Sequence, residues 1–400
     1  MYSLSKVRSY ENLGLIILGL GIAIAGIYSY KLFSFLMPLI TLSLFWSQRG
    51  IKNFHFNLSP PLFFLFLLLI YTGISISWAE NLPSALKTFI ALSVTSLFAS
   101  LFISCVMRAS PDLISKAYRI MQISGLILMV LVVFQALMDT FQVEISNKFK
   151  NIPYMMKPTG SILGLMAFVG CAFLWIKKER FFSIYIFLFF FPLIILTLCK
   201  TAFYGLLLAS CIFILSYAMP FWVTRISMIS TYTFLIVSPI LYAYLVSPAR
   251  VLDSPYFTWI LNRSFFHRFL AWEFYSKKFF EQPLLGWGLD SSRFLWENSR
   301  IVEEYDNTLH PHNNSLQAYV ELGLGGGILY ALFFASLFWM VEKNVKDRLS
   351  VAVCNATLIF AFVEAEVTHN LWRNYWLSLL TLTAGLLILF LKAREAQLRA

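Results

Sequence analysis

The sequence predicts an all-α polytopic membrane protein. Its composition, the lengths of its apolar runs and the distribution of its basic residues all indicate this class. Of the 400 residues, 59% are hydrophobic, 18% are aromatic and only 13% are charged. A soluble chain with so little charged surface would expose more apolar area than water tolerates, whereas lipid accepts apolar side chains on every side. The composition therefore excludes a soluble domain of ordinary size.

Apolar runs of roughly 17 to 25 residues are long enough to cross a bilayer as helices. Ala23-Ile24-Ala25 in the first run is also compatible with a signal-peptide cleavage site, which would leave the other spans unchanged. About twelve transmembrane helices are predicted by this criterion, at 13–30, 32–47, 60–78, 88–107, 119–138, 160–176, 181–198, 202–219, 226–246, 312–340, 350–368 and 374–391.

The domain organisation follows from these spans. Residues 1–246 hold nine predicted transmembrane helices, residues 247–309 form one large loop, and residues 310–400 hold the last three helices and a cytoplasmic tail. We call residues 247–309 the inter-span segment. Its stretch FFHRFLAWEFYSKKFF is amphipathic enough to form a helix that lies on the membrane or caps a cavity. The PLLGWGLDSSRF that follows combines Pro, Gly and Asp as turns do.

The basic residues predict the orientation, because Lys and Arg accumulate in the cytoplasmic loops of membrane proteins. With a cytoplasmic N-terminus, 17 of the 31 Lys and Arg residues fall inside, seven fall in short outer loops and seven fall in the inter-span segment. We therefore expect both termini in the cytoplasm and the inter-span segment on the outer side. This topology explains the net charge of +11 without a nucleic-acid partner.

Three motifs in one order resemble the O-antigen ligase and polymerase family, whose members move oligosaccharides from undecaprenyl diphosphate. HPHNNSLQAYVELGLGGG has a His-Asn pair, nine residues and then Gly-x-x-Gly. RFLAWEFYSKKFFEQPLLGWGLD has an Arg four residues before a Trp, then Pro and Gly-x-Gly, and SISWAENLPSALK is similar to the pattern after an early helix. The resemblance covers most of the chain. It implies a GT-C-like membrane fold in the bacterial inner membrane, with an active site that faces the periplasm.

His312 is the candidate general base of the reaction. An imidazole titrates near neutrality and can accept a proton from an attacking sugar hydroxyl, with Asn313 orienting the base or a substrate. A continuous helix beginning near His312 would bring Gly323 back to nearly the same face. Small residues there, including Gly326, would let another helix approach closely. The resemblance implies substrate-binding roles for Asn313, Gly323 and Gly326, whereas spacing alone also allows His310 and His312 to end an interfacial helix.

The departing diphosphate requires fixed positive charge. Arg268 heads the Arg-x3-Trp motif and can hold phosphate through its bidentate fork, and the resemblance implies that Trp272 helps to bind the substrate. The family usually has a second arginine outside the seventh helix, where this chain has Lys200 in LTLCKTAFYG. Lys200 keeps the charge but not the fork. The alternatives are a solvated surface charge for Arg268 and a snorkelling lysine at a helix end for Lys200.

Three glutamates near the last spans are candidate site residues. Glu321 would lie within the tenth span, about half a turn from His312, and we expect it to pair with a neighbouring helix because intramembrane carboxylates are costly. Glu364 and Glu366 lie near the outer end of the eleventh span. They either position acceptor hydroxyls or are simply interfacial.

No cofactor and no metal site are expected. The isolated Asp253, Asp290 and Asp306 form no DxD-like metal motif. The five cysteines lack CxxC spacing and indicate neither a disulfide framework nor a zinc site. We therefore expect metal-independent transfer, in which cationic side chains stabilise the diphosphate.

The predicted function is that of an O-antigen ligase, which transfers an undecaprenyl-diphosphate-linked oligosaccharide to a sugar hydroxyl of the lipid A core. The expected partners are this donor, the lipid A core acceptor and membrane lipids. O-antigen polymerase and protein O-oligosaccharyltransferase are alternatives within the family. A flippase or transporter is the alternative from another class, although no inverted halves are evident in the sequence.

Overall fold

The computed structural model describes residues 14–17, 19, 30–48, 59–140, 157–244, 263–297 and 310–399. All regular elements within these ranges are helices. In chain order, the principal helices are η2 (Tyr30–Leu32), α3 (Phe33–Ser47), α4 (Pro60–Ser75), η4 (Ile76–Trp78), α5 (Leu82–Met107), α6 (Pro111–Thr140), α8 (Lys157–Ile176), α9 (Arg180–Leu196), α10 (Lys200–Ala218), α11 (Pro220–Tyr244), α14 (Arg263–Glu281), α15 (Ser292–Glu297), α16 (Asn314–Asn344), α17 (Arg348–Val367) and α18 (Asn374–Arg399).

Ten helical segments of the described ranges are long and apolar enough to cross a membrane. The helix α9 is also apolar but shorter, at 17 residues. Together these segments account for eleven of the twelve predicted spans. The first predicted span, 13–30, lies largely outside the described residues. The prediction of an all-α polytopic membrane protein is confirmed.

The helices turn apolar side chains outward, as a membrane protein requires. Along α5, the residues Leu82, Leu86, Ile90, Val94 and Leu97 form one helical stripe and are 43% to 61% exposed. A spacing of three and four residues keeps these side chains on one face. Such a surface would be unstable in water but suits contact with lipid tails.

The interior of the bundle is built around α8 and α17. Nearly every side chain of α8 from Thr159 to Ile176 is buried, and α8 packs against α9, α10, α17 and α18. The helix α17 also packs along α10, while α11 and α4 pack along α16. The last three spans therefore contact helices from most of the chain.

Several helices begin earlier than predicted, because capping signals precede the apolar runs. The helix α5 begins at Leu82 rather than at 88, since the side chain of Asn81 accepts a hydrogen bond from the Ser84 N–H at 3.0 Å. Proline at a first or second helical position costs no hydrogen bond. The helices α6 and α11 accordingly begin at Pro111 and Pro220 rather than at 119 and 226.

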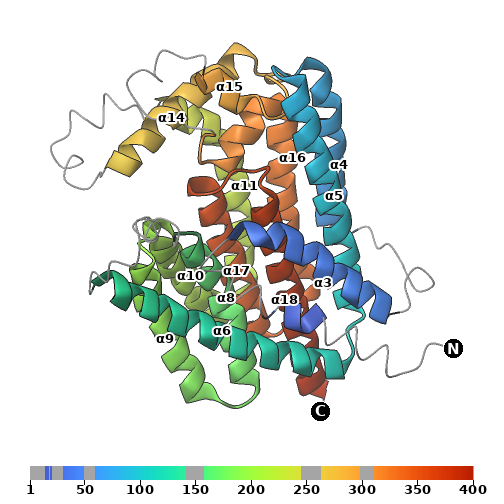
Figure 1. Cartoon of the computed structure of the whole chain (residues 1–400), viewed down its shortest axis with the longest axis vertical. Coiled ribbons are helices and arrows are strands. Elements are labelled where there is room, and N and C mark those ends of the chain that lie inside the picture. The colour runs from blue at the N-terminus through green and yellow to red at the C-terminus, as the bar shows by residue number, and fades with distance from the viewer. Residues whose placement is uncertain are drawn as a thin grey trace.

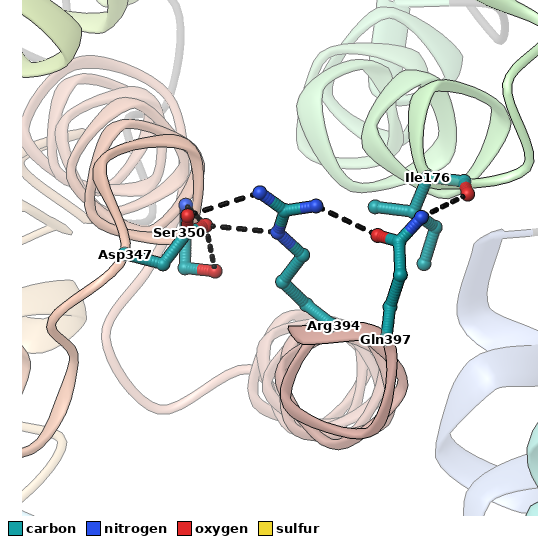
Figure 2. Close-up of polar contacts among 5 residues, drawn as sticks. All are labelled: Ile176, Asp347, Ser350, Arg394 and Gln397. Carbon is teal, nitrogen blue, oxygen red and sulfur yellow. Dashed lines mark hydrogen bonds and ion pairs between the residues drawn. The ribbon is translucent and has the colours of Figure 1, made fainter. Parts of the chain in front are cut away.

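An ion pair joins the ends of three helices (Figure 2). The guanidinium of Arg394 on α18 donates to both carboxylate oxygens of Asp347, at 3.1 and 3.0 Å. Asp347 also caps α17 by accepting from the Ser350 N–H. Gln397 accepts from Arg394 and donates to the carbonyl of Ile176 at the end of α8. Because this clamp involves α8, α17 and α18, it fixes the core helices at one end.

The described part of the inter-span segment, α14 and α15, lies at the opposite end of the molecule from the C-terminus (Figure 1). The helix α14 is amphipathic, as predicted, and packs against α11 and α16. Its apolar side, including Ala271, Trp272 and Tyr275, is buried. The candidate residues of the motifs are found at this end.

Candidate functional site

The helix that carries the Gly-rich motif is broken, which corrects the prediction of a continuous helix from His312 through Gly323. The helix α16 begins at Asn314, and its backbone leaves helical geometry at Gly323, with φ of 64° and ψ of −162°. This conformation is open essentially only to glycine. His312 lies before the helix, also at positive φ, 52°. The sequence alone gave no sign of the break, because glycines also occur within closely packed membrane helices.

The break in α16 receives the loop between α14 and α15, residues 282–291, which we call the docking loop. A Cβ atom at Gly323 would lie 2.3 Å from the carbonyl oxygen of Leu284. Three backbone hydrogen bonds join the two segments: Trp287 N–H to Val320 O at 2.9 Å, Gly288 N–H to Glu321 O at 2.8 Å and Leu324 N–H to Pro283 O at 2.8 Å. Gly323 therefore positions the inter-span segment against α16.

The glycines after the break have different neighbours. A Cβ at Gly325 would meet the Tyr71 ring of α4 at 3.1 Å, so another helix does approach there, as predicted. Cβ atoms at Gly326 and Gly327 would instead meet Leu322 and Tyr319 of α16 itself, each at 2.1 Å. Gly326 thus provides space for the half of α16 that precedes the break.

Glu321 is fully buried and anchors the same junction. Its carboxylate accepts hydrogen bonds from the Asp290 N–H at 2.6 Å and from the Ser292 hydroxyl. Gln317 at 3.0 Å and the indole N–H of Trp372 at 2.6 Å also donate to it. The expected pairing with a neighbouring element is therefore found, with hydrogen-bond donors as the partners. Such satisfaction is what a buried carboxylate requires.

The Arg-x3-Trp motif connects α14 to the four residues that precede α16. The buried indole of Trp272 donates to the carbonyl oxygen of Pro311 at 3.0 Å and packs on Tyr242, with ring centroids 4.9 Å apart. Residues four apart share one face of a helix, so Arg268 lies one turn from this contact. The spacing of the motif therefore brings the Arg268 turn of α14 next to the segment that carries His312.

Asn313 caps α16 and is completely buried. Its side-chain oxygen accepts from the Leu316 N–H at 2.7 Å and from the Ser315 hydroxyl at 2.9 Å. Its amide nitrogen donates to the Tyr242 hydroxyl at 2.8 Å and to the Glu366 carbonyl at 3.0 Å. Both polar atoms of the side chain are occupied by the fold. Asn313 is therefore placed to orient the preceding residue, His312.

The ring of His312 is held by a backbone carbonyl. Its Nδ1 lies 3.1 Å from the carbonyl oxygen of Thr368, just beyond the end of α17. A carbonyl can only accept, so Nδ1 carries the proton and Nε2 is the basic nitrogen of the neutral ring. His310 has a supporting role, because its Nδ1 accepts the His312 backbone N–H at 3.1 Å. The two rings lie 4.1 Å apart.

Positive charge surrounds these histidines. Burial lowers the pKa of His310 well below its usual value, and the nearby His312, Arg373, His369 and Arg268 lower it further. Burial also lowers the pKa of Arg268, against the opposing effects of Cys199 and Glu364, yet a guanidinium remains charged at any ordinary pH. Sequence reasoning counted Arg373, in the α17–α18 connection, only among the basic residues of the short outer loops. An anion that enters this region would meet two arginines.

Lys200 is less closely associated with this charge. It is the exposed first residue of α10. Its neighbour Cys199 is buried, and burial raises the pKa of the Cys199 thiol to about 12. The charges of Glu364, Arg268 and Lys157 also affect this pKa, so Cys199 lies near all three. Lys200 therefore follows a residue that lies near the site, while its own side chain is exposed.

The two predicted glutamates of α17 differ in their environments. Glu366 accepts hydrogen bonds from the N–H and hydroxyl of Ser315, at 3.2 and 2.6 Å, and from Tyr330 at 3.3 Å, so it stabilises the start of α16. Glu364 accepts from the Ser161 hydroxyl at 2.5 Å, but its Oε1 is buried without a hydrogen-bond partner. Glu364 is the glutamate with an unsatisfied oxygen beside the site.

Two further residues of the site were not predicted. His369 lies 3.2 Å from the Ser161 hydroxyl and 3.5 Å from the carboxylate of Glu364. Ser161 is on α8, more than 200 positions away in sequence, and no local pattern connects the two. The available signal was the pair His369-Asn370 at the end of an apolar span, which repeats the His-Asn pair of the main motif.

Fold and site together define a multi-pass helical membrane protein whose polar, positively charged site lies where the inter-span segment meets α16 and α17. No known family model matches the chain. It is similar to a "putative polysaccharide ligase" of Rickettsia conorii, with 30% identity over 118 residues, 28% of each chain. A protein of the same name from Rickettsia felis is 25% identical over 231 residues, 56% of each chain.

A third similar protein, from Rickettsia prowazekii, has the same descriptive name and is 29% identical over 119 residues, 28% of this chain and 29% of that one. The chain thus spans about half the length, or less, of these curated relatives. Their names agree with the resemblance to O-antigen ligases that the three motifs indicated.

Proposed function

We propose that the chain is a glycosyltransferase of the O-antigen ligase type, which moves an oligosaccharide from undecaprenyl diphosphate to a sugar hydroxyl of the lipid A core. The observation that carries the proposal is the contact between the Arg-x3-Trp motif and the His-Asn motif, which are distant in sequence. Trp272 bonds to Pro311, and this contact places the Arg268 turn of α14 beside His312. A base and a fixed cation in one place suit a hydroxyl acceptor and an anionic leaving group.

His312 is the proposed general base. The Thr368 carbonyl fixes the tautomer in which Nε2 can accept the proton of the acceptor hydroxyl. The oxygen of this hydroxyl then attacks the anomeric carbon, and the bond from that carbon to the diphosphate oxygen breaks. A single displacement of this kind inverts the anomeric configuration. His310 accepts a hydrogen bond from the His312 backbone N–H, and Asn313, the residue after His312, is fixed by its cap of α16.

Arg268 is the proposed partner of the departing diphosphate. A guanidinium offers two parallel donors to phosphate oxygens, and its partial burial strengthens the interaction relative to water. Lys200, at the exposed start of α10, supplies a further positive charge at the rim. We place this site on the periplasmic face of the bacterial inner membrane, because the distribution of basic residues predicts that the inter-span segment lies outside.

The lipopolysaccharide ladder of a deletion strain tests the proposal. An O-antigen ligase leaves bare lipid A core when it is deleted, while undecaprenyl-linked polymer accumulates. Core with a single repeat unit would instead identify an O-antigen polymerase, and loss of all units from the outer face would identify a flippase. An unchanged ladder with unglycosylated proteins would indicate a protein O-oligosaccharyltransferase.

A further inference from the structure

We propose that His369 is a positioning residue for the transfer, which acts with Ser161 and Glu364 to fix the backbone carbonyl that orients His312. The inference rests on the proposed function, since it concerns the same base. It starts from the carbonyl that contacts His312, which lies outside regular helix. The carbonyl beside Nδ1 of His312 belongs to Thr368, which lies beyond the last residue of α17, Val367.

The segment after α17 is held first through its backbone. The N–H groups of Thr368 and His369 both donate to the carbonyl oxygen of Glu364, at 3.0 and 3.3 Å. These bonds close the end of the helix, and the second one involves the peptide plane that contains the Thr368 carbonyl, because that carbonyl and the His369 N–H belong to one planar unit. The position of His369 therefore determines where this carbonyl points, and the contacts of its side chain hold that position.

The side chain of His369 is fixed on both sides and does not reach the site surface. Its ring stacks on Trp376 of α18, with centroids 3.9 Å apart and planes inclined by 16°. Its Nε2 lies 3.2 Å from the Ser161 hydroxyl of α8, and the residue is only 3% exposed. A side chain this enclosed acts through its neighbours rather than by touching a substrate.

The hydrogen bonds of the cluster have one direction. The carboxylate of Glu364 can only accept, so it takes the single hydroxyl proton of Ser161. The Ser161 oxygen must then accept from His369, which places the ring proton on Nε2. The proton donors thus follow the order His369, Ser161, Glu364, and these hydrogen bonds connect the α17–α18 connection to α8. Glu364 in turn lies near the positive charge of Arg268, whose pKa it affects.

A base displaced by about 1 Å from its working position costs on the order of 10²-fold in rate. Removing the hydrogen bond between His369 and Ser161 should therefore slow the chemical step without weakening the binding of the donor. We expect Ser161→Ala and His369→Ala to lower kcat by about 10- to 100-fold while the KM for the donor stays within about twofold. His369→Gln should recover much of the rate, because its amide N–H can still reach Ser161.

The experiment uses the purified full-length protein with an undecaprenyl-diphosphate-linked oligosaccharide and lipid A core, and measures initial rates and thermal unfolding for each variant. Ser183→Ala is the matched control, since it removes another buried serine hydroxyl, which donates to Cys171 O at 2.8 Å far from His312 in the fold. It should keep the wild-type kcat.

Two results would overturn the positioning role. One is a wild-type kcat in Ser161→Ala and His369→Ala. The other is a loss of rate in all variants, Ser183→Ala included, that follows only their loss of thermal stability. The same assay separates the levels of the argument. A wild-type protein without transfer activity refutes the proposed function, and a fully active His312→Ala refutes the role of His312 as the base. An inactive His312→Ala beside fully active His369→Ala refutes only the positioning role.

Discussion

Replacement of Gly323 by alanine should disconnect the inter-span segment from α16. The backbone at Gly323 has φ of 64° and ψ of −162°, a region that costs a residue with a Cβ about 1 to 3 kcal/mol. The added atom would also lie 2.3 Å from the Leu284 oxygen and 2.8 Å from the Gly286 nitrogen. Both neighbours are backbone atoms, so the docking loop must move.

Movement of the docking loop puts three backbone hydrogen bonds at risk, those made by Trp287, Gly288 and Leu324. Each contributes about 0.5 to 1.5 kcal/mol. With the backbone strain, the total loss is about 2.5 to 7.5 kcal/mol, which is a large part of the stability of an ordinary protein. The turn of α14 that carries Arg268 is connected to this loop and should lose its position as well.

Thermal unfolding in detergent and initial transfer rates below the melting temperature test this reasoning. Gly323→Ala should unfold several degrees lower and should transfer oligosaccharide much more slowly than the wild type. Gly170→Ala is the control, because a Cβ there meets no atom within 4 Å. A Gly323→Ala variant with the stability and rate of the wild type would refute the proposed role of the break.

Three other perturbations have definite expected results. Trp272→Phe removes the donor to the buried Pro311 carbonyl, so it should cost about 1 to 3 kcal/mol of stability and lower the transfer rate; an unchanged rate would show that this contact does not position the site. The pKa of His310 is lowered in the folded protein, so stability should fall by about 1.4 kcal/mol for each pH unit below about 6.5, and thermal melts of His310→Gln should show a weaker dependence. Partial burial would raise the pKa of Asp347, but hydrogen bonds from Arg394 and Ser350 outweigh it and hold the pKa below its usual value. The clamp should therefore stabilise the wild type above about pH 4 and weaken as pH falls further, whereas Asp347→Asn should be less stable at neutral pH and lack this acid transition.

The sequence predicted the parts of the fold that depend on continuous hydrophobicity. Apolar runs identified the helices, and the amphipathic pattern in FFHRFLAWEFYSKKFF identified α14. The motifs selected Arg268 and His312 as candidate site residues, and the Trp272–Pro311 contact brings the segments that carry them together. Helix starts were less accurate where Asn81, Pro111 and Pro220 begin helices before the apolar run does.

The parts that the sequence could not predict depend on contacts between distant segments. Gly323 allows either a packed helix or a break, and only the docking loop determines which occurs. Ser161 and His369 each look ordinary in their own helix or turn, and they acquire a role because α8 packs against α17. The same holds for Glu366, whose partners are on α16.

The central claim is that His312 is the base of a glycosyl transfer. The most direct test is the initial rate of purified His312→Ala with a saturating undecaprenyl-diphosphate-linked donor, measured alongside donor binding and compared with His310→Ala. We expect His312→Ala to lose about 10² to 10⁴ in rate while it binds the donor as the wild type does, and His310→Ala to lose much less. A His312→Ala variant with a near-normal rate across pH, beside an inactive Arg268→Ala, would contradict the claim and leave donor activation as the driving chemistry.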